Sequence, residues 1–511
     1  MEEEKEKKSN SKRRVVKTDE DRVNGQEKCP KCGSTDISPS SKSGKLRCNF
    51  CRCEFKPEKL EGMEKDISKL EGEVVTSGLQ DIQEDTKNVI TLKCSSCGAE
   101  VVIDTASSAQ ARCHWCRNTL SLNAQIPNGS VPDVILPFKI NKDIAKTHIE
   151  KFVKKRRFFA HPKFKKEFTT ENIMGVYFPY MLVDVNAHAN FSGAGEHETR
   201  SYEVVVGRDS NGHPITETRY DADVYKVERD FDITIEGLSI ESNSDRLNTT
   251  SKAKTNNIIN SIMPFDIENC TKYSANYLKG YTSEKRDVNV DQIKELVNTQ
   301  SKDIARFAIN DDLKKYDRGV RWDVENLKVK GEQWQAAYLP VWLYSYQQKK
   351  GEKSILHYVA VNARTEETMG SIPINQFKLI SISSIIEAIC IIGMLFVEDD
   401  VRYFFLALGV VFYVIMYLRY RNSNARHTYE KETKRDITNI KRVDKFIRSE
   451  TGLDSSTMDG ANNTQVYGAK NKQIKNITGN KFGDHIINKA LEDTLVADVV
   501  KQNIEKKDKD Q

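Results

Sequence analysis

The sequence lacks an apolar run near its start and any large excess of one charge. Residues 1–26 alternate Glu with Lys and Arg, which excludes a secretory signal and predicts a disordered, solvated tail. Lys and Arg number 79 and Asp and Glu 74, and the resulting net charge of +5 identifies no class of partner. Hydrophobic residues still make up 38% of the 511 residues, enough for at least one packed core among three or four structural units.

Catalytic signatures are also missing. The sequence contains no H-E-x-x-H, no G-x-S-x-G and no G-x-x-x-x-G-K-[ST], and Gly193-Ala-Gly195 is too short for a dinucleotide loop. His188 and His197 flank that loop and could bind a metal with Glu196, although scattered polar residues near a strand end more often have no such role. The sequence therefore favours a protein that is not an enzyme.

Cysteines are concentrated in two clusters with the same internal spacing. Each cluster has two C-x2-C pairs separated by fifteen residues, of which the first is Gly and the last is Arg. Four thiolates at this spacing form a closed tetrahedral shell that favours zinc over iron, and such reduced cysteines indicate the cytosol. The predicted ligands of two zinc ions are Cys29, Cys32, Cys48 and Cys51, and Cys94, Cys97, Cys113 and Cys116.

These clusters predict two zinc ribbons, at residues 27–57 and 89–124, joined by an acidic linker at 58–88 that could hold a short helix. About thirty residues bury too little surface to fold alone, so the metal should stabilise each ribbon. We expect Cys53 to bind no metal. The first ribbon is mildly basic, so its surface could contact nucleic acid, or it could dock on a protein. Its basic residues are Lys28, Lys31, Lys42, Lys45, Arg47, Arg52 and Lys56.

Residues 131–375 predict an α+β domain on the cytosolic side of a membrane. Asn141 should cap a helix, a second apolar helical face runs from Ile293 to Ala308, and Asn211-Gly212 should close a hairpin. A short repeat, Tyr177-Phe-Pro-Tyr-Met-Leu and Tyr338-Leu-Pro-Val-Trp-Leu, should place each Pro at the entrance of a strand. A dense basic run at 151–166 suits anionic lipid, nucleic acid or plain solvent.

Two apolar segments, 379–397 and 401–420, predict a transmembrane hairpin. Acidic residues 398–400 separate them, and Lys378 and Arg419 flank the pair, so the positive-inside rule places both long flanks, and hence both termini, in the cytosol. Glu387 lies within the first span and should make an interhelical hydrogen bond, with Tyr413 at a similar depth. A buried helical pair in a soluble domain is the alternative.

The C-terminal region should be a helical tail. Residues 421–448 predict a basic juxtamembrane helix, residues 449–480 a disordered linker, and residues 481–505 an amphipathic helix that returns to the body or binds a partner.

This order of features resembles bacterial zinc-ribbon membrane proteins described as containing a transcription-factor-B type ribbon, some of which are labelled primosomal or helicase-like. The resemblance covers roughly residues 94–420, and its implications are metal binding and membrane residence without an established activity. A helicase label does not fit a chain that lacks a phosphate-binding loop. The matching motifs are Cys94-Ser-Ser-Cys97-Gly, Leu136-Pro-Phe-Lys139, Gly175-Val-Tyr-Phe-Pro, Met263-Pro-Phe-Asp266, Tyr277-Leu-Lys-Gly280, Tyr338-Leu-Pro-Val-Trp342 and Tyr358-Val-Ala-Val-Asn362.

We therefore expect a multidomain, membrane-anchored zinc-ribbon protein that acts as a non-enzymatic binding or scaffold module. A membrane-tethered nucleic-acid-binding protein is one alternative, and an accessory subunit of a transporter or hydrolase is another. The expected partners are the lipid bilayer and a protein, with nucleic acid left open, and the chain could form a homo-oligomer.

Overall fold

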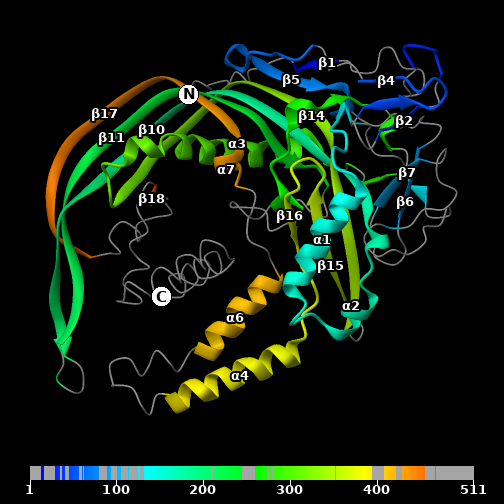
Figure 1. Cartoon of the computed structure of the whole chain (residues 1–511). Helices are drawn as coiled ribbons and strands as arrows, with labels where there is room; N and C mark the ends of the chain where they lie inside the picture. The colour runs from blue at the N-terminus through cyan, green and yellow to red at the C-terminus, as the bar shows by residue number, and fades with distance from the viewer. Residues whose placement is uncertain are drawn as a thin grey trace, which may run out of the picture.

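The molecule is built around one large mixed sheet that arches over a helix (Figure 1). The computed structural model describes residues 13–16, 29–34, 37–40, 45–56, 60, 62–79, 89–93, 100–104, 113, 125–126, 132–208, 212, 214–243, 259–273, 275–278, 281–284, 286, 288–350, 353–393, 408–421, 428–454 and 466–467.

Four long antiparallel strands form the arch. They are β10 (Met174–Arg208), β11 (Pro214–Glu241), β14 (Gly319–Lys350) and β17 (Lys434–Asp454), and their order across the sheet is β14, β10, β11, β17. The first part of β10 is buried on both faces, and its later part alternates buried and exposed side chains as one face meets solvent. β10 and β11 form the hairpin expected at Asn211-Gly212, and Gly212 has the positive φ, +85°, that such turns favour.

The short sequence repeat pairs with itself in this sheet. Tyr177 lies opposite Pro340, and Pro179 lies opposite Tyr338, so the two copies run antiparallel across β10 and β14. The prediction of strand entrances was wrong, because both prolines lie inside long strands. Their carbonyls accept hydrogen bonds from the N–H groups of other segments, Ser242 for Pro179 and Ala363 for Pro340, each at 3.1 Å.

The remaining strands of this sheet are short and extend or flank the arch. They are β1 (Arg14–Val16), β5 (Gly72–Thr76), β6 (Val89–Lys93), β7 (Glu100–Asp104), β8 (Gln125–Ile126), β9 (Val134–Ile135), β12 (Thr271–Lys272), β13 (Thr282–Glu284), β15 (Lys353–Asn362), β16 (Thr368–Gly370) and β18 (Val466–Tyr467).

The two helices expected in the central region are present. Asn141 caps α1 (Lys142–Arg156) by accepting from the Ile144 N–H at 3.0 Å, and the short α2 (Pro162–Glu167) follows it. α3 (Val290–Ala308) lies beneath the arch, beside the single-turn helix α7 (Tyr429–Glu432), as Figure 1 shows. Its buried apolar face joins a core of strand residues that includes Phe191, Phe231, Trp322 and Trp334.

The segment between the ribbons is part of the sheet, which corrects the prediction of a linker at 58–88. β5 pairs in parallel with β14, and β1, inside the tail predicted to be disordered, pairs with β5. Buried Asp133 secures this segment by accepting hydrogen bonds from the Thr76 hydroxyl and from the Gly78 N–H, the latter at 2.7 Å. The contacts of this segment join residues that are far apart in the sequence, so local sequence patterns do not reveal them.

The basic segment after the apolar helices is a strand, so the juxtamembrane helix predicted at 421–448 was wrong. β17 occupies residues 434–454, including the first part of the predicted linker 449–480, and pairs with β11 along most of its length. Asp444 accepts from buried Arg229 at 3.0 Å and from the Tyr316 hydroxyl at 2.6 Å. This pairing with the body outweighs the local helical pattern. The helix predicted at 481–505 lies outside the described residues.

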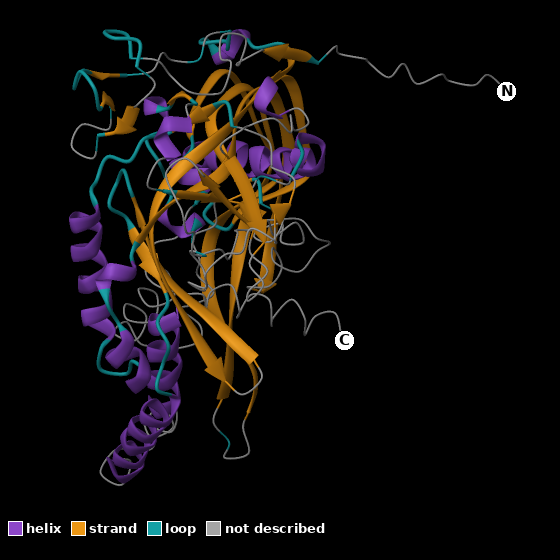
Figure 2. Ribbon diagram, turned by 90° about the vertical axis from the view of Figure 1, so that its right-hand side faces the viewer, coloured by secondary structure: helices purple, strands orange, loops and turns teal. Residues whose placement is uncertain are grey.

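Two apolar helices, α4 (Gln376–Gly393) and α6 (Leu408–Arg421), project from the body side by side (Figure 2). Among the described residues, α4 is the one helix long and apolar enough to cross a membrane, and the described part of α6 is shorter. The ends that meet the body pack on α1 and its following turn, where Phe159 contacts Phe412 and Tyr420.

Candidate metal centre

The first cysteine cluster is held by a small antiparallel sheet. Its strands are β2 (Ile37–Pro39), β3 (Leu46–Cys48) and β4 (Glu54–Phe55). Ile37 and Leu46 are completely buried and belong to the same apolar core as Phe138 and Trp342 of the body. The ribbon is therefore packed on the large sheet, so its position relative to the body is defined.

Two turns of equal geometry present the four thiols. In the first, the Cys29 N–H donates to the Ser34 carbonyl at 2.9 Å and the Gly33 N–H donates to the Cys29 carbonyl at 2.8 Å. In the second, Cys53 takes the place of Ser34 and Arg52 the place of Gly33, with both bonds at 2.9 Å. The two C-x2-C turns of this cluster therefore share their backbone hydrogen bonds as well as their cysteine spacing.

Both turns require a left-handed residue after the second cysteine. Gly33 has φ +71°, as the C-x2-C-Gly pattern predicts, but Arg52 has φ +61° in the second turn. A residue with a Cβ adopts this conformation at a cost of roughly 1 kcal/mol. The missing glycine at position 52 was the signal in the sequence for this strain.

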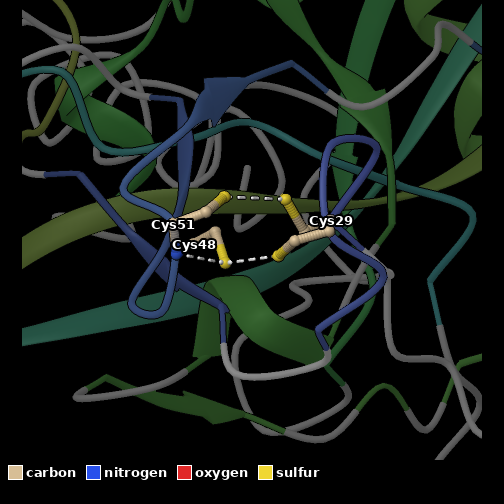
Figure 3. A group of neighbouring side chains, drawn as sticks. Cys29, Cys48 and Cys51 are labelled. Carbon is tan, nitrogen blue, oxygen red and sulfur yellow. Dashed lines mark hydrogen bonds between the residues drawn. The ribbon is translucent and has the colours of Figure 1, made fainter.

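The four sulphurs fit a tetrahedral metal. All four Sγ atoms lie within 4.8 Å of one another, with Cys29 and Cys51 3.5 Å apart and Cys32 and Cys48 3.6 Å apart (Figure 3). A zinc ion with Zn–S bonds of about 2.3 Å would place its sulphurs roughly 3.8 Å apart. The donor set and its spacing thus suit a closed zinc site, and Cys53 lies outside this group of four.

The pKa values of the clustered thiols also favour a bound cation. The Cys51 backbone N–H donates to Cys48 Sγ at 3.5 Å and lowers the pKa of that thiol to about 6. The Ser34 N–H lowers the pKa of Cys32, but desolvation and the adjacent thiols of Cys51 and Cys48 outweigh it and raise this pKa to about 12. Four thiolates so close together can ionise together only around a cation, which agrees with a divalent metal.

The second predicted cluster is described only in part. Cys113 is buried, whereas Cys94, Cys97 and Cys116 lie outside the described residues. Strands β6 and β7 flank the position of the first C-x2-C pair, and β7 joins the large sheet by pairing with β13. The described strands therefore belong to the large sheet, and the second ribbon stays a prediction.

The structure does not bring His188, Glu196 and His197 together. His188 contacts Asp232 at 2.9 Å and Asp230 at 3.2 Å, Glu196 accepts from the Tyr220 hydroxyl at 3.0 Å, and His197 lies 3.5 Å from Asp317. In the part of the chain that is described, the cluster of Cys29, Cys32, Cys48 and Cys51 is the one group of such ligands that could hold a metal ion.

One exposed aromatic side chain beside the metal centre was missed by sequence reasoning. Phe50 lies between the two cysteines of the second turn and is 81% exposed. Arg47 and Arg52 lie near it in the sequence, so the basic ribbon does have an exposed aromatic side chain among its cations. An aromatic residue inside a C-x2-C turn, which projects from the fold, was the signal for it.

The site chemistry stands on these observations alone. The chain matches no family model, no curated protein and no solved structure, so its resemblance to zinc-ribbon membrane proteins stays a prediction.

Proposed function

We propose that this chain is a membrane-anchored zinc-ribbon protein that serves as a non-enzymatic binding or scaffold module on the cytosolic face of a membrane. The observation that carries this proposal is the attachment of a four-cysteine centre and an exposed apolar helix to one continuous body. A scaffold needs a fixed geometry between its anchor and its binding surface, and the shared core supplies that geometry.

The exposure of α4 supports insertion in a bilayer. It has 18 residues, a length of about 27 Å, and only 11% of it is buried. A core helix of a soluble domain would be covered, so the apolar surface of α4 needs lipid around it. α6 packs beside α4, also has exposed apolar side chains, and would supply the second span of a hairpin.

The closed sulphur shell supports a structural role for the metal. Four protein ligands leave no position for a substrate or water, so zinc here would hold the ribbon together. We propose a second zinc at the cluster of Cys94, Cys97, Cys113 and Cys116. Thiolates remain available to zinc only where disulfides do not form, which favours the cytosol.

The exposed Phe50 supports a protein partner at the tip of the first ribbon. A large aromatic side chain that is left in solvent costs free energy, and aromatic anchors are enriched at the centres of protein interfaces. The ribbon would thus present Phe50 to a cytosolic protein, while α4 holds the chain at the membrane.

The test uses the intact chain in its native membrane. A photo-crosslinking residue at position 50, activated in intact membranes that are washed with carbonate only afterwards, should capture one discrete protein in a manner insensitive to nuclease. The same residue at position 446, another exposed phenylalanine, is the control. Recovery of the chain in the soluble fraction, or equal capture at both positions, would contradict the proposal.

Phe50 beside Arg47 and Arg52 also favours a second candidate, binding of single-stranded nucleic acid at the membrane, since aromatic and cationic side chains together bind bases and phosphates. Salt-sensitive binding of oligonucleotides that is lost in Phe50→Ala would support this candidate, and binding unchanged in that variant would exclude it at this site.

A further inference from the structure

Where α4 and α6 meet the body, several cations gather without an acidic partner. The lower end of α1 lies beside the body ends of both apolar helices (Figure 1). The five basic side chains at this junction are Arg156, Arg157, Lys165, Lys378 and Arg419. In the described part of the chain, none of the five forms an ion pair with a carboxylate.

Two of these cations share one weak acceptor. Lys378 Nζ donates to the Phe158 carbonyl at 3.1 Å, and Lys165 Nζ donates to the same oxygen at 3.5 Å. Both side chains are half-buried. A neutral carbonyl cannot compensate two ammonium charges, so this position has unused capacity for an anion.

A third cation strengthens the positive field. Arg156 is buried and donates to two carbonyls, that of Arg419 at 3.2 Å and that of Phe152 at 3.3 Å. Burial and the neighbouring Arg419 lower the pKa of Arg156 to about 10, and burial, Lys378 and Arg157 lower the pKa of Lys165. Burial is the larger cause of both pKa shifts, and the neighbouring positive charges add to it.

Exposed aromatic rings flank the cations on the side of the apolar helices. Phe158 is 59% exposed and Phe377 is 83% exposed, and Lys378 Nζ lies 3.6 Å from the centre of the Phe158 ring. With α4 in a bilayer as proposed above, its start at Gln376 would place these rings and lysines at the boundary between hydrocarbon and headgroups. Lipid phosphates occupy this same level.

We propose that Lys165 and Lys378, supported by Arg156 and Arg157, bind the phosphate of an anionic phospholipid at the junction of α1, α2 and α4. This proposal rests on the membrane anchoring proposed above. Ammonium groups take the phosphate as point charges, while Phe158 and Phe377 contact the upper acyl chains. A zwitterionic lipid would bind less well because its own amine opposes the cations.

The test is lipid competition on the full chain in detergent, with bound lipids counted by native mass spectrometry in an equal mixture of phosphatidylglycerol and phosphatidylcholine. The wild-type chain should prefer phosphatidylglycerol, and Lys165→Gln/Lys378→Gln should lower this preference by about twenty-fivefold, since each cation near an anionic surface contributes roughly fivefold. Lys165→Arg/Lys378→Arg should keep the preference. The matched control, Lys139→Gln/Lys146→Gln, removes two exposed lysines farther from the junction and should also keep it.

Three outcomes would overturn the proposal: an unchanged preference in Lys165→Gln/Lys378→Gln, an equal loss in the control, or displacement of the lipid by glycerol 3-phosphate, which would assign the cations to a soluble phosphate. Carbonate washing of membranes that carry the wild-type chain separates the two proposals. An anchored chain without lipid preference would refute only this site, whereas a chain released by carbonate would refute the anchoring itself.

Discussion

Glu387 Oε2 accepts a hydrogen bond from the backbone N–H of Gly409 at 2.7 Å, which joins α4 to α6. The interhelical bond expected for Glu387 therefore exists, but its partner is a backbone group. Tyr413, the side chain expected at that depth, donates to Gln376 Oε1 at 3.0 Å, near the body. Close approach of the backbones leaves no room for a side chain at position 409.

Gly409→Ala should separate the two helices. A Cβ at this position would lie 2.5 Å from the Ser383 carbonyl oxygen and 2.7 Å from Glu387 Cβ, so the variant should lose about 1–3 kcal/mol of stability. The measurement is the thermal midpoint of the full chain in detergent. Gly393→Ala, where a Cβ meets nothing within 4 Å, should leave the midpoint unchanged. Equal effects of the two changes would contradict this packing.

Removing a ligand of the first cluster should release one metal. Cys48→Ser should lower the zinc content from two ions to one per chain, because three thiolates and a hydroxyl hold zinc poorly. The measurement is elemental analysis of the purified chain. Cys53→Ser is the matched control and should retain full zinc, since Cys53 lies outside the cluster. Loss of zinc in the control would mean that the ligand set is different.

Arg52→Gly should strengthen the first ribbon. Glycine adopts the φ of +61° without the steric cost that arginine pays, so the ribbon should gain roughly 1 kcal/mol. The measurement is the rate of zinc transfer to a chelator, which should fall. Arg52→Ala removes the same charge but keeps a Cβ and should give no such gain. A similar fall in both variants would attribute the effect to charge.

Asp444→Ala should loosen β17 from the arch. Arg229, which is only 1% exposed, would lose its carboxylate, and Tyr316 would lose its acceptor, at a cost of about 3 kcal/mol. Hydrogen exchange at β17 amides should accelerate. Asp436→Ala removes an exposed carboxylate from the same strand and should leave exchange unaltered. Unchanged exchange in Asp444→Ala would show that strand pairing alone holds β17.

Glu196 should make stability depend on pH. Burial raises the pKa of Glu196, and the Tyr220 hydroxyl lowers it only in part. The pKa of this carboxyl is thus higher in the folded protein than in the unfolded chain, where it is about 4.3. Its protonated form favours the folded state below the pKa of the unfolded chain, and this contribution to stability disappears as pH rises through the pKa of the folded protein. Glu196→Gln should therefore match the wild-type thermal midpoint near pH 4 and exceed it at pH 7.

The control for this pH dependence is Glu203→Gln, which removes an exposed carboxylate from the same strand. Its difference from the wild-type midpoint should not grow between pH 4 and pH 7. A constant difference for Glu196→Gln as well would show that the buried carboxyl does not control the pH dependence.

Local signals in the sequence were sufficient for several elements. The capping residue Asn141 and the apolar stripe after it predicted α1, Asn211-Gly212 predicted the β10–β11 hairpin, and C-x2-C spacing predicted the first metal cluster. Each of these features depends on residues close together in the chain, where backbone preference and spacing act directly.

Long-range pairing decided the remainder. The basic residues 434–454 have an apolar face at helical spacing, yet they form β17 because β11 offers a full ladder of hydrogen bonds and Arg229 a buried charge for Asp444. β5 likewise forms because it pairs with a distant strand, β14, and Asp133 accepts a hydrogen bond from the Gly78 N–H just after it. The sequence by itself determined the cysteine cluster, the apolar helices and the local turns. Only the tertiary structure decided which segments complete the sheet and where Lys165 meets Lys378, because those choices depend on partners far away along the chain.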